Sequence, residues 1–138
     1  MSEPIVELKS EDFDEKFRIK PEAQSRLKLK RRVCILFFSP QCGHCVRFHP
    51  NYVAAAKKYK NASFATINCM LERGIMDRFR SANPKTLEYT VEGYPTVVSY
   101  LNGRYFSTYA QGNGEFRSIP DVIQYASGIG QKGIIRWV

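Results

Sequence analysis

Two cysteines separated by two residues are the part of this sequence best suited to chemistry. Cys42 and Cys45 enclose Gly43 and His44, a spacing typical of redox pairs at the start of a helix. The first sulfur of such a pair lies near backbone N–H groups that have no helical partner, and their field favours thiolate over thiol. The sequence therefore predicts that Cys42 is the nucleophile.

The other three residues of this segment support that nucleophile. Cys45 lies one turn further into the helix, so we expect it to be shielded, to have the higher pKa, and to resolve the mixed disulfide that Cys42 forms with a substrate. Gly43 and His44 are expected to tune the thiol pKa. An imidazolium at His44 stabilises the thiolate and makes the disulfide a stronger oxidant.

A metal site is the alternative reading of the same segment. Cys42, His44, Cys45 and His49 are all zinc ligands by type, but the sequence has no second, well-spaced Cys/His pair. A c-type haem would need histidine in place of Val46. We expect no metal and no cofactor beyond the redox-active cysteine pair, and we assign His49 no role.

The chain pattern predicts a strand, a turn and a helix that hold the motif. Residues 33–38 are six consecutive apolar residues, typical of a strand buried on both faces. From Cys45 to Tyr59 apolar residues recur at helical spacing, so the motif starts a helix, which Pro50 should kink and which should end near Asn61. Cys34 and Cys69 lie in strand-like contexts and are expected to be small buried hydrophobes.

The remaining elements follow from the same kinds of signal. A strand at 5–8 precedes a helix from Ser10 to about Phe17, and the basic connector 18–32 holds at most a partial helix. The further expected elements are a strand at 63–68, a helix at 72–80, a hairpin of 96–101 and 104–109 around Asn102-Gly103, and a last helix capped by Ser118. The tail 134–138 has no assignment.

This order predicts an α/β fold with a central mixed sheet flanked by helices. Crossover helices require parallel strands, and the C-terminal hairpin adds an antiparallel edge. With 138 residues, of which 43% are hydrophobic and 25% charged, the chain fits one compact domain over 1–138, with 130–138 unassigned. We expect a monomer.

The net charge of +8 raises the question of an anionic partner. Five positive charges lie in 26–32, which could bind phosphate, direct nuclear import or form a solvated connector. No aromatic residues interleave these charges, so we expect no nucleic-acid partner. No run reaches the roughly 20 apolar residues of a membrane span, and the N-terminus lacks a signal sequence. The expected compartment is intracellular, or the endoplasmic reticulum lumen if the chain is cut from a longer precursor.

The segment 37–50, with its strand, CGHC motif and helix proline, resembles the active-site segment of protein disulfide isomerase domains in the thioredoxin superfamily. The segment 91–96 is similar to the second signature of that family, in which the proline is cis and lies against the active-site sulfurs. The resemblance implies a thioredoxin fold and disulfide exchange with protein substrates, with an upstream thiol oxidase or reductase as electron partner. It places Gln41, Tyr94 and Pro95 in the substrate-binding edge.

Two positions depart from the family pattern. Gln41 stands where the family has a tryptophan, which predicts a more polar substrate-facing surface. Leu36 stands where the family has a buried acidic residue that assists proton transfer at the resolving cysteine, which predicts slow resolution. These departures keep two alternatives open: a low-turnover substrate- or partner-binding module, and a general reductant of the thioredoxin type.

Overall fold

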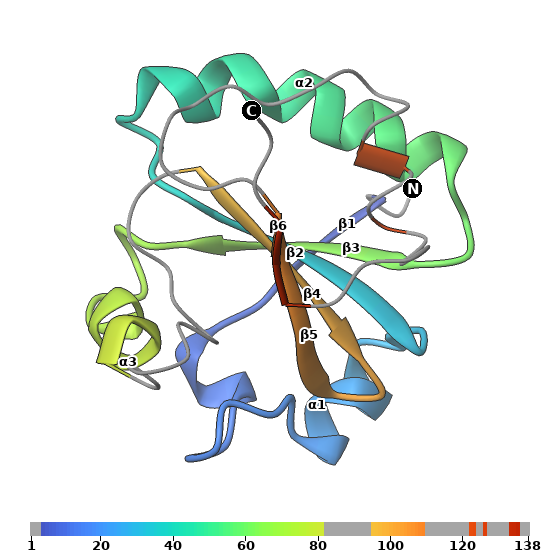
Figure 1. The fold of residues 1–138 in the computed structure, drawn as a ribbon, viewed down its shortest axis with the longest axis vertical. Helices are drawn as coiled ribbons and strands as arrows, with labels where there is room; N and C mark the ends of the chain where they lie inside the picture. The colour runs from blue at the N-terminus through green and yellow to red at the C-terminus, as the bar shows by residue number, and fades with distance from the viewer. Residues whose placement is uncertain (1–3, 82–94, 110–121, 124–125, 127–132, 136–138) are drawn as a thin grey trace.

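A six-stranded mixed sheet forms the centre of the molecule, with helices on both of its faces (Figure 1). The computed structural model describes residues 4–81, 95–109, 122–123, 126 and 133–135. The strand order is β1-β3-β2-β4-β5-β6. The strands are β1 (Ile5–Glu7), β2 (Arg32–Phe38), β3 (Ser63–Asn68), β4 (Thr96–Leu101), β5 (Arg104–Tyr109) and β6 (Gly133–Ile135).

The helices divide between the two faces of the sheet. The longest, α2 (Gly43–Lys58), covers one face, and α1 (Pro21–Arg26) and α3 (Ile75–Ser81) lie on the other (Figure 1). Each face has its own core of buried apolar side chains. The predicted fold class, a central mixed sheet flanked by helices, is confirmed.

Strand β2 contributes side chains to both cores, one on each face of the sheet. It pairs in parallel with β3 and antiparallel with β4, so it is central, as predicted. Its side chains alternate: Ile35 and Phe37 pack with the α1 and α3 side, whereas Cys34 and Leu36 pack with the α2 side. All four are at most 1% exposed, which accounts for the continuous apolar run of the sequence.

Helix α2 is fixed to the sheet by one buried hydroxyl as well as by apolar packing. The Tyr52 hydroxyl lies 2.9 Å from the carbonyl oxygen of Cys34 and 2.8 Å from that of Ala65, on the neighbouring strands β2 and β3. The Tyr52 side chain is fully buried beside Phe48 and Phe64. This contact sets the height of α2 above the strand that leads into the cysteine motif.

The predicted helix from Ser10 to Phe17 is wrong in type and length. Only Ser10–Asp12 forms a single 3₁₀ turn. Beyond it, the Asp14 carboxylate accepts hydrogen bonds from the backbone N–H groups of Lys16 and Arg18, at 2.8 and 2.9 Å. A short acidic side chain that binds nearby N–H groups competes with helical bonding, so the chain turns instead.

Several of the positively charged side chains in the basic stretch 26–32 contact other parts of the fold. Arg26 ends α1 and forms a 2.6 Å ion pair with the buried Asp12 carboxylate. The Arg32 guanidinium lies 5.8 Å from the centre of the Phe106 ring. These contacts favour the connector interpretation over a ligand-binding patch.

The C-terminal part of the sheet extends beyond the prediction. The hairpin β4–β5 has the predicted bounds, and Asn102 and Gly103 both have the positive φ that such a turn needs, 52° and 79°. The hairpin is not the edge, because β6 pairs in parallel with β5. Ser118 and most of the last predicted helix lie outside the described residues, although Val122 and Ala126 are buried in the α2-side core. In the part of the chain that the structure describes, no helix is long and apolar enough to cross a membrane.

The buried thiol of Cys34 makes fold stability depend on pH at alkaline values. Burial raises its pKa from 9.0 to about 12, so between these values the unfolded chain loses a proton that the folded chain keeps. We expect the wild-type free energy of unfolding to fall, relative to a Cys34→Ala variant, by about 1.4 kcal/mol per pH unit. Urea unfolding of both proteins from pH 8 to 10.5 measures this, and parallel pH curves would contradict it.

Candidate active site

The cysteine motif begins where β2 ends. The backbone N–H of Cys69, just after β3, donates to the carbonyl of Phe38 at 2.9 Å and so fixes the last residue of β2. The chain then turns: the N–H of Cys42 donates to the carbonyl of Ser39 at 3.0 Å. This turn places Cys42 directly before the first residue of α2, as the sequence predicts.

Cys42 is the N-cap of α2, with its sulfur in the role that a hydroxyl or carboxylate oxygen usually has. Its Sγ accepts the backbone N–H of Cys45 at 3.3 Å, while its carbonyl accepts the N–H of Val46 at 3.1 Å. The first turn of α2 contains no acidic residue. The positive end of the helix therefore acts on the Cys42 sulfur without an opposing charge in that turn.

Cys45 is the buried member of the pair, with 3% of its surface exposed, whereas Cys42 is half-buried. Burial is the largest cause that raises the pKa of Cys45 to about 12; the hydrogen bond with Cys42 and the charges of Cys42 and Cys69 add to it, and the backbone N–H of Ser39 opposes it. The expectation that Cys45 is shielded is confirmed. Both cysteines are thiols in this structure.

Arg47 is a site residue that the sequence reasoning missed. Its guanidinium lies 2.7 Å from Nδ1 of His44, and because arginine can only donate, the imidazole accepts. The same guanidinium covers Gly43, where an added Cβ would meet it at 3.5 Å. A permanent positive charge therefore lies over the first turn of α2. The spacing of three residues between His44 and Arg47 on a helix could have indicated this contact.

The predicted substrate-binding residues are only partly described. Gln41 is exposed beside Cys42, and its N–H donates to the Ser39 hydroxyl at 3.3 Å. Pro95 is buried and directly precedes Thr96, which pairs with Phe37. This register brings Pro95 to the end of β2 from which the motif starts. Tyr94 lies outside the described residues.

The side chain that replaces the family's acidic residue is fully buried. Leu36 is 0% exposed and packs with Phe48 and Tyr52 of α2. Within the described part of the chain, the groups that act on the pKa of Cys45 are Cys42, Ser39 and Cys69, none of which is a carboxylate. Among the residues that the structure describes, no three His, Cys, Asp or Glu side chains are placed to hold a metal ion.

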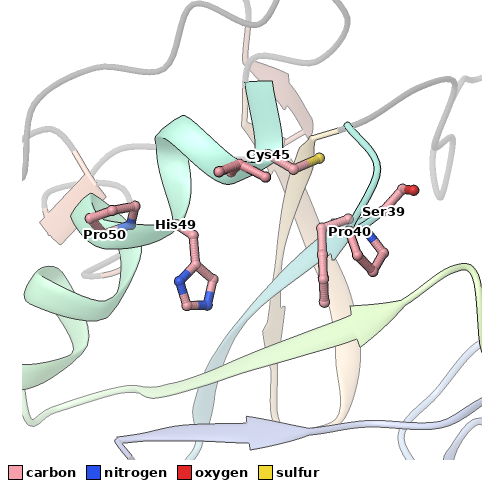
Figure 2. Close-up of a pocket in the computed structure, with 7 residues that line it drawn as sticks. Ser39, Pro40, Cys45, His49 and Pro50 are labelled. Atoms are coloured by element: carbon pink, nitrogen blue, oxygen red, sulfur yellow. The ribbon is translucent and has the colours of Figure 1, made fainter. Parts of the chain in front are cut away.

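A groove of about 260 Å³ opens beside Cys45, between the first two turns of α2 and the turn that precedes the motif. It is lined by Phe38, Ser39, Pro40, Cys45, Val46, His49 and Pro50. Figure 2 shows the Cys45 sulfur pointing toward Ser39 and Pro40, with the His49 ring on the same side of α2, one turn further along. The Cys45 thiol thus lines a surface groove although little of it is exposed.

The comparison with known families agrees with this geometry. The family model Thioredoxin matches residues 5–124. The chain belongs to the thioredoxin family. It is similar to protein disulfide-isomerase of Saccharomyces cerevisiae, with 32% identity over 96 residues, and to protein disulfide-isomerase A3 of Gallus gallus, with 32% identity over 107 residues. This supports membership among the thiol–disulfide oxidoreductases.

The chain spans about a sixth of the length of these two relatives. The two alignments span 69% and 76% of this chain, but only 17% of each relative. The first thioredoxin domain of mouse protein disulfide-isomerase A4 has a similar structure, with a TM-score of 0.61 and 20% identity over 94% of this chain and 78% of that one. This likeness confirms the thioredoxin fold.

The guanidinium of Arg47 should increase the reactivity of Cys42. We expect an Arg47→Gln variant to react with iodoacetamide about two- to fivefold more slowly at Cys42 at pH 7 and low salt, because one exposed charge near a helix start contributes about 0.3–1 kcal/mol. The measurement is stopped alkylation with mass spectrometry. Lys57→Gln, at the other end of α2, is the matched control, and an equal effect of both changes would contradict the role of Arg47.

Proposed function

We propose that this chain is a thiol–disulfide oxidoreductase of the protein disulfide isomerase type that forms, reduces or isomerises disulfides in protein substrates. The observation that carries the proposal is the asymmetry of the two thiols. Cys42 is accessible and caps the helix, whereas Cys45 is buried with a raised pKa and lies one turn away. One thiol can therefore attack from outside while the other stays protonated until a mixed disulfide has formed.

The cycle follows from these positions. The Cys42 thiolate attacks one sulfur of a substrate disulfide, which breaks that bond and releases the other substrate sulfur as a thiolate. Cys45 then attacks the Cys42 sulfur, so that the substrate leaves with both of its sulfurs reduced and the pair becomes a disulfide. The same steps in reverse oxidise a substrate dithiol. Neither direction needs a bound cofactor, and a partner thiol oxidase or reductase resets the pair.

Substrate contact is proposed for the surface around Cys42. Gln41 is exposed next to the proposed nucleophile, and Pro95 directly precedes β4 at the same end of the sheet. An extended protein segment could lie along this edge with its backbone paired to the chain. The polar side chain of Gln41 favours substrates that form hydrogen bonds beside the cysteine.

Insulin reduction and the refolding of scrambled ribonuclease test the activity. We expect the wild type to catalyse both reactions and Cys42→Ser to abolish both, because the variant has no nucleophile. Cys45→Ser should form a mixed disulfide with the substrate that persists on a non-reducing gel. A wild type without either activity would support the second candidate, a low-turnover binding module, which the apolar Leu36 and the polar Gln41 favour.

Equilibration with glutathione tests the direction of the reaction. Thioredoxins have potentials of about −270 mV and protein disulfide isomerases about −180 mV. We expect a value nearer the second, because the helix start and Arg47 stabilise the thiolate form of the reduced pair. A value near −270 mV would instead indicate a general reductant of the thioredoxin type. The dithiol fraction is measured by alkylation and mass spectrometry.

A further inference from the structure

The proposed resolving step must remove a proton from Cys45, and the described residues on the sheet side of α2 offer no group to take it. Burial is the largest cause that raises the pKa of the Cys45 thiol, and Cys45 is 3% exposed, so its proton must be taken by another group before it can attack. The strand beneath α2 contributes Leu36, a fully buried apolar residue, to that side of the core. A proton leaving Cys45 therefore has no described acceptor toward the sheet.

The groove beside Cys45 offers the proton a route to bulk solvent. Its volume of about 260 Å³ has room for several water molecules, each of which occupies about 30 Å³ in the liquid. Pro50, which lines the groove, has no N–H and so gives no helical hydrogen bond to the carbonyl of Val46, four residues earlier.

His49 is the one titratable side chain, apart from Cys45 itself, among the described residues that line this groove. It lies one helical turn after Cys45, and Figure 2 shows its ring on the groove side of α2. Histidine is the side chain best suited to take and return protons near neutral pH. The ring is also exposed, so it can pass a proton on to bulk water.

We propose that His49 is the proton acceptor for Cys45 during resolution, acting through water in the groove. The inference rests on the proposed disulfide-exchange function and assigns a role to a residue that the sequence pattern left without one. In the step, the Cys45 proton passes through water to the imidazole, and the Cys45 thiolate attacks the Cys42 sulfur. The bond between Cys42 and the substrate sulfur breaks, and the substrate leaves as a thiolate with that electron pair. Return of the proton to the leaving sulfur completes the balance.

The surroundings of the two groups support this pairing. In the described part of the chain, the charges of Cys42 and Cys69 raise the pKa of Cys45 in addition to burial. Across the groove from His49, the described chain contributes Phe38, Ser39 and Pro40, none of which carries a charge. Among the described residues that line the groove, none apart from Cys45 itself carries a titratable side chain that could compete with His49 for the proton.

The lifetime of the mixed disulfide measures the step directly. Reduced protein is mixed with oxidised glutathione, quenched in acid at set times, and analysed by mass spectrometry for the glutathione adduct of Cys42. We expect His49→Gln to lengthen the lifetime of this adduct about tenfold or more at pH 7, since a positioned base contributes about 10² to 10⁴. The effect should shrink toward pH 10, where hydroxide replaces the base.

Three further variants separate proton transfer from a packing role. His49→Glu, which restores a base, and imidazole added to His49→Ala should both shorten the lifetime, whereas pyrazole, a weakly basic ring of the same size, should not. Lys57→Gln, the same replacement on the exposed end of α2, should leave the lifetime unchanged. A normal lifetime in His49→Gln, or a long one that neither base shortens, would overturn the role of His49.

The first step of the same experiment tests the proposed function separately. Cys45→Ser should accumulate the glutathione adduct at the wild-type rate, because Cys42 alone forms it. If no adduct forms in the wild type or in this variant, the oxidoreductase proposal fails and the inference fails with it. If the adduct forms normally and His49 has no effect on its lifetime, only the inference fails.

Discussion

The hydrogen bond from the Cys45 N–H to the Cys42 sulfur is the interaction on which the site depends. It makes a cysteine the cap of α2, so the start of this helix and the proposed nucleophile are one feature. The sulfur lies in the field of the helix end only because the turn after β2 presents it there. The hydrogen bond from the Cys69 N–H to the Phe38 carbonyl fixes the start of this turn, because it joins the ends of β2 and β3. Sheet register thus determines the reactivity of a thiol.

The same arrangement gives the two thiols opposite environments. Cys42 is half-buried in a positive field that Arg47 strengthens, and Cys45 is buried where charge is costly. The apolar Leu36 offers no proton acceptor on the sheet side of the helix, and the proposed proton route therefore runs through the surface groove. Specialisation of two identical chemical groups therefore comes from their positions one helical turn apart.

Local sequence signals predict most of this fold and the core of the site. Strands β2 to β5 and helix α2 have strong apolar patterns or turn residues, and the CGHC segment identifies both cysteines. Two elements were missed for physical reasons. The Asp14 side chain captures two backbone N–H groups and breaks the expected helix, which a periodicity pattern does not reveal. Strand β6 is three residues long and exists through its pairing with β5, more than 20 residues earlier.

The site residues divide in the same way. Cys42 and Cys45 are recognisable by type and spacing, whereas Arg47 acts through a long side chain that folds back over Gly43. No sequence pattern indicates a role for His49, and only the structure shows that it lines the same groove as Cys45. Contacts made by flexible side chains and cavities between segments are tertiary properties, which a linear pattern records poorly.

The strand order has a further consequence for how the molecule fluctuates. The short strands β1 and β6 form the two edges of the described sheet, and β2 has neighbours on both sides. Edge strands of three residues open first in native-state fluctuations, while a central strand opens only with the whole domain. The edges can therefore fray, exchange their amide hydrogens or meet other chains while the cysteine pair keeps its geometry.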